Sequence, residues 1–153
     1  MKILFVCTGN MCRSPSAELL LKKRLKEEGI SGVEVSSAGV GADDGRPCPE
    51  DTLEALNRRG VDGRSHRSRM LTAEVVRTSD LILAMTEAHQ TVVEIRFPAA
   101  AGKVDLLKSY AGRCGDVDDP FDGGSEAQDM CLAEIAEAVE GILRKVKNDG
   151  GDA

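Results

Sequence analysis

The sequence has no tryptophan, few aromatic residues and only two histidines. Aromatic residues make up 3% of the 153 residues and hydrophobic residues 41%, so we expect a core of Leu, Val, Ile and Ala. A zinc site needs four ligands at short paired spacings, whereas His66 and His89 stand alone and Cys7 and Cys12 form one loose pair. We therefore predict neither a metal nor an organic cofactor, and we interpret His89 as a surface residue of a helix.

Long hydrophobic runs and an excess of positive charge are also absent. The apolar run Ile3 to Cys7 is too short for a signal peptide, and no stretch approaches the length of a membrane span. The net charge of −6 argues against nucleic acid or an anionic membrane as the main partner. The five cysteines, an odd number at scattered positions, do not resemble a secreted disulfide framework. We expect a cytoplasmic monomer with reduced thiols.

Apolar runs of strand length alternate with helical patterns along the chain. Buried or alternating runs predict strands at 3–6, 33–36, 81–84 and 104–107. Helices are predicted at 14–29, 49–59, 72–77, 87–97 and 125–146, the first capped by Ser14 and the third by Thr72. This order predicts a single α/β domain, with a four-stranded parallel sheet and helices on both faces. We place the domain at 1–147 and expect 148–153 to be a disordered tail.

The segment Cys7 to Ser14 lies where a predicted strand ends and a helix begins, the place where open parallel sheets bind ligands. Backbone N–H groups of such a turn form an anion cradle, and Gly9 permits unusual dihedral angles there. The same partial positive charge favours the ionised form of the Cys7 thiol, which is the nucleophilic form. The planar guanidinium of Arg13 matches two phosphoryl oxygens, and Ser14 can donate to the thiolate. These groups suit phosphoryl transfer to sulfur.

A second polar segment, 116–124, offers a proton donor for the leaving group. It carries four carboxylates, at Asp116, Asp118, Asp119 and Asp122, and Pro120 stiffens the chain after Asp119. Phe121 is an apolar ring in a polar loop and is suited to the wall of a substrate pocket. Composition alone favours a solvated turn here, and only the pairing with the Cys7 loop favours a functional role.

Four segments together resemble the low-molecular-weight protein-tyrosine-phosphatase family: Val6 to Pro15, Ser37 to Gly39, Asp80 to Met85, and Asp119 to Phe121. The resemblance implies a phosphorylated protein substrate and a phosphocysteine intermediate at Cys7. It also implies that Asp119 protonates the leaving group and then activates the hydrolytic water.

The resemblance further assigns roles around the loop. Thr8, Gly9, Asn10, Met11, Cys12, Ser14 and Phe121 are expected to bind the substrate. Asn10 and Ser37 resemble a pair that braces the loop by hydrogen bonding, and His66 resembles a supporting, non-catalytic histidine. Cys12 resembles a neighbouring thiol that forms a reversible disulfide with Cys7 under oxidation.

The sequence points in two directions on the substrate. Met85 to His89 and Gly115 to Val117 resemble the bacterial protein-arginine-phosphatase branch. Met11, however, makes the pocket wall apolar, which suits a phenyl ring better than a guanidinium. We therefore predict phosphotyrosine as substrate, with phosphoarginine as the alternative.

Two other functions receive less support. An arsenate reductase needs closely spaced redox cysteines, whereas Cys48, Cys114 and Cys131 are far apart in the sequence. A non-catalytic phosphate-binding module is the other alternative, but a pure binder needs neither Cys7 nor Asp119.

Overall fold

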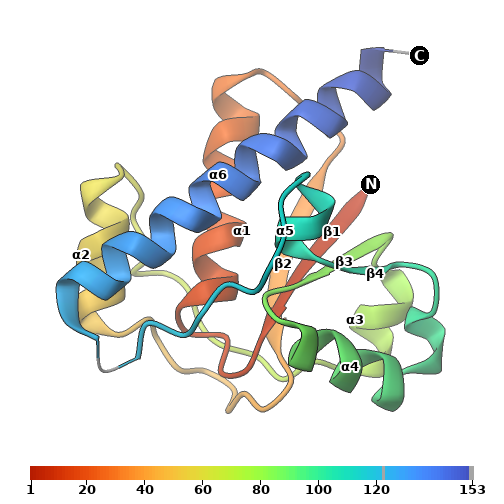
Figure 1. Ribbon diagram of the computed structural model, residues 1–153, viewed down its shortest axis with the longest axis horizontal. Coiled ribbons are helices and arrows are strands. Elements are labelled where there is room, and N and C mark those ends of the chain that lie inside the picture. The colour runs from red at the N-terminus through yellow and green to blue at the C-terminus, as the bar shows by residue number, and fades with distance from the viewer. Residues whose placement is uncertain (122, 152–153) are drawn as a thin grey trace.

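The sheet at the centre of the molecule has four parallel strands in the order β2-β1-β3-β4. Their bounds are β1 (Lys2–Cys7), β2 (Glu34–Gly39), β3 (Leu81–Ala84) and β4 (Val104–Leu106). The structure is a computed structural model that describes residues 1–121 and 123–151 (Figure 1). The predicted α/β class and parallel sheet are confirmed.

Helices cover both faces of this sheet. They are α1 (Arg13–Glu27), α2 (Glu50–Arg58), α3 (Ala73–Thr78), α4 (Glu87–Arg96), the 3₁₀ helix η1 (Pro98–Ala100), α5 (Leu107–Tyr110) and α6 (Gly124–Gly151). Helix α6 runs diagonally across α1, whereas α3 and α4 lie together at the other side of the sheet (Figure 1).

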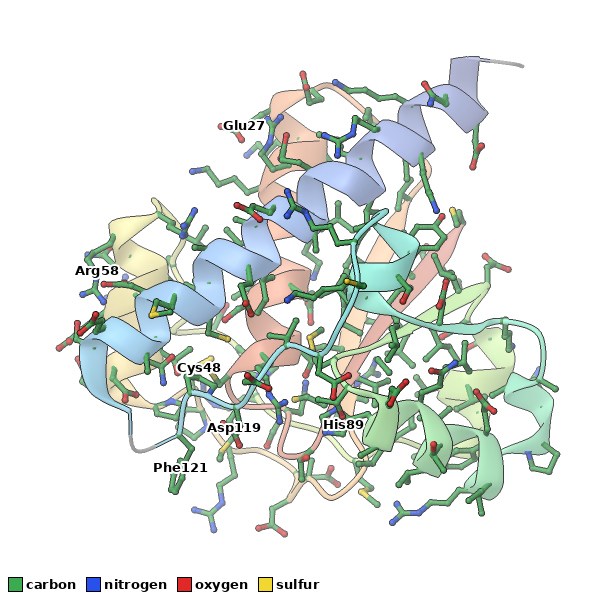
Figure 2. All side chains as sticks on the ribbon, viewed as in Figure 1. Glu27, Cys48, Arg58, His89, Asp119 and Phe121 are labelled. Carbon is green, nitrogen blue, oxygen red and sulfur yellow. The ribbon has the colours of Figure 1, made fainter. Side chains whose placement is uncertain are left out.

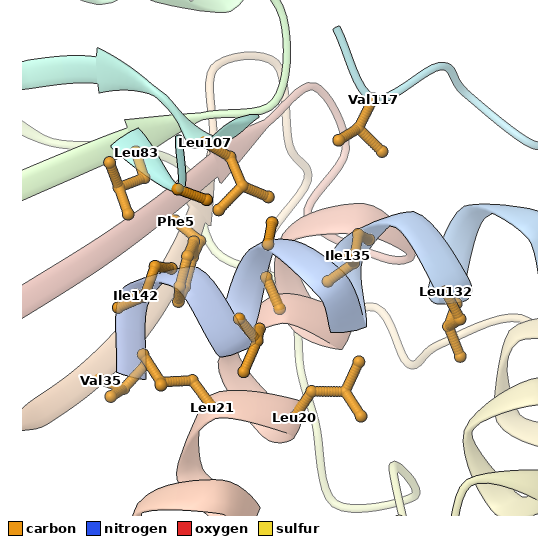
Figure 3. Close-up of a cluster of buried hydrophobic side chains, with 14 of the residues drawn as sticks. Phe5, Leu20, Leu21, Val35, Leu83, Leu107, Val117, Leu132, Ile135 and Ile142 are labelled. Atoms are coloured by element: carbon orange, nitrogen blue, oxygen red, sulfur yellow. The ribbon is translucent and has the colours of Figure 1, made fainter. Parts of the chain in front are cut away.

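Strand β1 supplies side chains to a separate core on each face, as the period of two in a strand requires. Ile3 and Phe5 point into the core under α1 and α6, and Leu4 and Val6 point into the core under α3 and α4. Figure 3 shows Phe5 at the centre of the first core, between the sheet and the two helices. Because β1 is buried on both faces, its carboxyl end holds Cys7 in a fixed position.

Several predicted boundaries need correction. Helix α1 begins at Arg13 with Cys12 before it and no side-chain cap, so Ser14 does not cap it. Thr72 does cap α3, since its hydroxyl accepts a hydrogen bond from the backbone N–H of Val75. The short helices η1 and α5 were not predicted, because each is a single turn without its own periodic pattern.

Helix α6 extends to Gly151, past the predicted end at Val146. Residues 148–151 are therefore helical where a disordered tail was predicted, and residues 152–153 lie outside the described part of the chain. Lys147 forms an ion pair with Glu28 at the end of α1, which holds this part of α6 against the domain. Among the described helices, none combines the length and the apolar character that a membrane crossing requires.

Candidate active site

The predicted site residues come together at the carboxyl end of β1, where residues 8–12 lead into α1. They line a cavity of about 500 Å³ that includes Cys7, Met11, Arg13, Asp119 and Phe121. Figure 2 shows Asp119, Phe121 and His89 on this same side of the molecule. Two segments more than a hundred residues apart in the sequence thus form one site.

The Cys7 thiol lies at the base of this cavity, buried and in contact with a hydroxyl group. Its Sγ is 2.9 Å from the Oγ of Ser14. That Oγ already accepts a hydrogen bond from the side-chain amide of Asn10, also at 2.9 Å. The hydrogen of the Ser14 hydroxyl is therefore free to point at the sulfur, where it favours the thiolate. The position at the start of α1 favours an anion further.

Asn10 holds the loop in its shape. It is fully buried and adopts a left-handed backbone conformation, with φ of 55°, which Asn tolerates better than most residues. Its side-chain amide donates to Ser37 Oγ at 2.9 Å as well as to Ser14, so the predicted Asn10–Ser37 contact is present. Its side-chain oxygen accepts from the backbone N–H of Arg69. His66 Nε2 lies 2.7 Å from the Asn10 carbonyl oxygen, behind the loop.

Two further residues of this bracing network, Glu18 and Arg69, were not predicted from the sequence. The Ser37 hydroxyl donates to Glu18 Oε1 at 2.6 Å, and Arg69 Nε donates to the Ser37 carbonyl oxygen at 2.9 Å. Glu18 is on the face of α1 that turns towards β2, but a glutamate in a helix carries no signal of such a contact. Both residues act on the loop through Ser37 and Asn10.

The guanidinium of Arg13 lies beneath the cavity, 6% exposed. Its Nη1 donates to the carbonyl oxygen of Val117 at 2.9 Å, and its Nη2 is 3.8 Å from Asp119 Oδ2. The Asp119 side chain is 59% exposed, and its Oδ1 accepts from the backbone N–H of Phe121. Arg13 thus joins the base of the cavity to the carboxylate at its rim.

The segment before Asp119 is anchored at two points. Val117 is fully buried and its N–H donates to the Met85 carbonyl oxygen at 2.8 Å. Asp116 Oδ1 accepts from the backbone N–H of Glu87 at the start of α4. Asp118 is exposed, and Asp122 lies outside the described residues. Phe121 is 78% exposed and lines the cavity.

His89 is not the surface residue that we expected, because only 6% of it is exposed. The first turn of α4 faces the Cys7 loop, where His89 Nε2 is 2.8 Å from Thr8 Oγ1 and Nδ1 is 3.0 Å from Thr86 Oγ1. Burial, and next the positive charge of Arg13, lower the pKa of His89 to about 4. The carboxylates of Asp116 and Asp119 oppose this shift but do not cancel it. The imidazole is therefore neutral near pH 7.

Cys12, which lines the cavity, interacts with Cys48 and Cys131, although the three cysteines are scattered in the sequence. Cys12 Sγ donates to Gln128 Oε1 at 3.3 Å, and a hydrogen bond with the Cys131 thiol lowers the pKa of Cys12. Burial, and next the nearby Cys12, raise the pKa of Cys48 to about 12. All five cysteines are free, so a reversible Cys7–Cys12 disulfide stays a prediction. Cys131 is buried as predicted.

Comparisons with known proteins agree with this geometry. Residues 2–151 match the family model described as "Low molecular weight phosphotyrosine protein phosphatase". The chain is 39% identical to a protein-arginine-phosphatase of Bacillus subtilis, covering 97% of this chain and 99% of the relative. It is 36% identical to a probable low molecular weight protein-tyrosine-phosphatase, EpsP, of Ralstonia solanacearum, covering 95% of each.

The fold is similar to that of a solved phosphatase over nearly its whole length. A structure of the arginine phosphatase YwlE, a mutant with a phosphorylated active-site serine, superposes with a TM-score of 0.93 at 38% identity and 97% coverage of each chain. Fold, site geometry and sequence similarity lead to the same conclusion. The chain belongs to the low molecular weight phosphotyrosine protein phosphatase family of cysteine-dependent phosphatases.

Proposed function

We propose that the chain hydrolyses phosphotyrosine in proteins through a phosphocysteine intermediate on Cys7. The observation that carries this proposal is the contact of 2.9 Å between Cys7 Sγ and Ser14 Oγ, at the base of a cavity whose rim carries Asp119. A buried sulfur with a hydroxyl donor, below an open cavity and beside a guanidinium, is a suitable nucleophile for a phosphoryl group.

In the first step, the Cys7 thiolate attacks phosphorus and the bond between phosphorus and the leaving oxygen breaks. The loop N–H groups and the guanidinium edge of Arg13 that does not face Val117 bind the phosphoryl oxygens. Asp119, in its protonated form, donates its proton to the leaving oxygen. Its place at the rim supports this role, since the leaving group must lie towards the open end of the cavity.

In the second step, water attacks the phosphorus of phosphocysteine and the S–P bond breaks. Asp119, now a carboxylate, accepts a proton from that water. The departing Cys7 thiolate receives a hydrogen bond from Ser14, so one hydroxyl stabilises the sulfur as attacking group and as leaving group. Inorganic phosphate is released.

The cavity lining favours an aromatic substrate. Met11, Pro49, Pro120 and Phe121 contribute apolar groups around the entrance. A phenyl ring packs against such groups without loss of hydrogen bonds, whereas a guanidinium requires polar partners. These contacts support phosphotyrosine.

Phosphoarginine is the second candidate, and two observations favour it. The arginine phosphatase of Bacillus subtilis is similar over nearly the whole chain, and the carboxylates of Asp51 and Asp119 line the same cavity. Either carboxylate is able to pair with a guanidinium.

Two peptides of one sequence, carrying phosphotyrosine or phosphoarginine, separate these candidates by their kcat/KM values. We expect the tyrosine peptide to be preferred, and Met11→Thr to shift the ratio by about tenfold towards phosphoarginine. Met11→Leu is the matched control and leaves the ratio near that of the wild type. A ratio unaffected by Met11→Thr would show that position 11 does not set the substrate preference.

Hydrolysis of para-nitrophenyl phosphate tests the function itself. We expect Cys7→Ser to abolish turnover while inorganic phosphate still binds. A wild-type protein that binds phosphate without turnover would support a non-catalytic module, and thiol-dependent reduction of arsenate would support an arsenate reductase.

We also propose that the protein acts as a cytoplasmic monomer. A reducing compartment keeps the Cys7 thiol in its nucleophilic state, and all five cysteines are free. The exposed large apolar residues come from five separate segments, at Met1, Met70, Ile95, Phe121 and Met130. Among the described helices and strands, none therefore presents a row of them to a second copy.

A further inference from the structure

We propose that His89 is a positioning residue that turns the hydroxyl of Thr8 into a hydrogen-bond donor for a phosphoryl oxygen of the substrate. The inference rests on the proposed phosphatase function and adds a side-chain donor to the loop amides and Arg13. Sequence patterns gave no indication of it, since His89 was expected at the surface.

Thr8 occupies the place where such a donor is useful. It follows Cys7 directly, is exposed and lines the cavity. Its carbonyl oxygen accepts from the backbone N–H of Gly41 at 3.0 Å, which fixes the backbone. Its Oγ1 is 2.8 Å from His89 Nε2, so the orientation of the hydroxyl depends on the imidazole.

The hydrogen bonds at Thr86 favour one tautomer of His89. Thr86 Oγ1 accepts from the backbone N–H of His89 at 3.2 Å, as the N-cap of α4. The same oxygen is 3.0 Å from His89 Nδ1, and the described residues offer the Thr86 hydroxyl hydrogen no other acceptor. Donation of that hydrogen to Nδ1 gives the Thr86 hydroxyl an acceptor within the protein, so we assign Nδ1 as the acceptor in this contact. A neutral imidazole then carries its own hydrogen on Nε2.

The consequence falls on Thr8. Because His89 Nε2–H donates to Thr8 Oγ1, the oxygen of Thr8 is an acceptor in this contact and its own hydrogen remains available. A phosphoryl group held above Cys7 offers anionic oxygens within the same cavity, which are strong acceptors. His89 thus acts on the substrate through Thr8, without contact of its own.

The electrostatic surroundings agree with a neutral imidazole. His89 is buried next to Arg13, and both features lower its pKa, to about 4. A second cation beside Arg13 would be unfavourable, whereas a neutral donor orients Thr8 at no such cost.

A matched pair of substitutions at position 89 tests the inference. The amide nitrogen of Gln reaches roughly the position of Nε2, whereas that of Asn reaches only roughly the position of Nδ1. We expect His89→Gln to keep kcat/KM for para-nitrophenyl phosphate within about twofold, and His89→Asn to lower it about tenfold. Thr8→Val should show the same loss and Thr8→Ser should show little.

The double variant distinguishes positioning from a general structural role. If His89 acts through Thr8, adding His89→Asn to Thr8→Val causes no further loss. Equal activity of the Gln and Asn variants, or losses that multiply in the double variant, would overturn the inference. If His89→Asn fails to fold, equal activity of Thr8→Val and Thr8→Ser overturns it instead. A wild-type protein without turnover removes the proposed function as well, whereas an active wild type with indistinguishable variants removes this inference alone.

Discussion

The two halves of the site differ in how firmly the structure holds them. On the phosphate-loop side, which we call the fixed half, Asn10, Arg13 and Ser14 are buried, and each makes at least one side-chain hydrogen bond. On the opposite side, which we call the exposed half, Asp119 and Phe121 are largely exposed. Asp119 accepts a hydrogen bond from within its own loop.

This difference matches the two tasks of a phosphatase. Stabilising a phosphoryl group requires donors that are fixed before the substrate arrives, because reorienting them during the reaction would cost free energy. Protonating a leaving group requires a carboxyl that also lets substrate enter and product leave, so an exposed loop is suitable. The contact between Arg13 and Asp119, at 3.8 Å, joins the two halves.

The largest effect is expected from a substitution in the fixed half, Arg13→Lys. An ammonium keeps the charge but cannot bind two phosphoryl oxygens and Val117 at once, so we expect kcat/KM to fall on the order of a thousandfold. The measurement is steady-state hydrolysis of para-nitrophenyl phosphate.

Arg58→Lys is the control for this substitution. Arg58 forms an ion pair with Asp129 on the surface, and Lys is able to replace it there, so activity should be unchanged. Near-normal activity of Arg13→Lys would show that the buried guanidinium is not a phosphate clamp.

A smaller and more selective effect is expected in the exposed half, from Asp119→Ala. With a poor leaving group such as phenyl phosphate, loss of the proton donor should lower kcat about a hundredfold. With a good leaving group such as para-nitrophenyl phosphate, the loss should be much smaller, because that oxygen needs less protonation.

Asp118→Ala is the matched control, since Asp118 is the exposed neighbour in the same loop. It should leave both rates unchanged. If Asp119→Ala reduces both substrates equally, Asp119 has another role, such as orienting Arg13.

Local patterns in the sequence were sufficient to predict the sheet and the position of the Cys7 loop. Strand β3 matches its predicted bounds, and Cys7 and Arg13 lie around one turn, where spacing alone limits their separation. Asn10 meeting Ser37 came from the family resemblance, and the hydrogen bond between them is present.

Contacts between distant segments could not be predicted in this way. The carbonyl oxygen of Val117, which fixes Arg13, is 104 residues away in the sequence, and a backbone group carries no side-chain signal. His89 is 81 residues from Thr8, and its burial depends on how α4 packs against the loop. A lone histidine on a helix does not indicate which segment will bury it.

The last prediction, on stability, concerns His89, which contacts the fixed half through Thr8. The pKa of His89 is about 4 in the folded protein, against 6.5 as the ordinary value, so between these pH values the unfolded chain binds a proton that the folded chain does not. The stabilisation is therefore complete above pH 6.5 and is lost as pH falls towards 4, by roughly 2 kcal/mol between pH 7 and pH 4.5. Urea unfolding of the wild type and of His89→Gln at both pH values measures this loss of stability, because the variant lacks the titrating imidazole. Arg13, Asp116 and Asp119 are the charged groups that act on His89, and all three are retained in the variant. If wild type and variant lose equal stability on acidification, the imidazole is not held neutral in the folded protein.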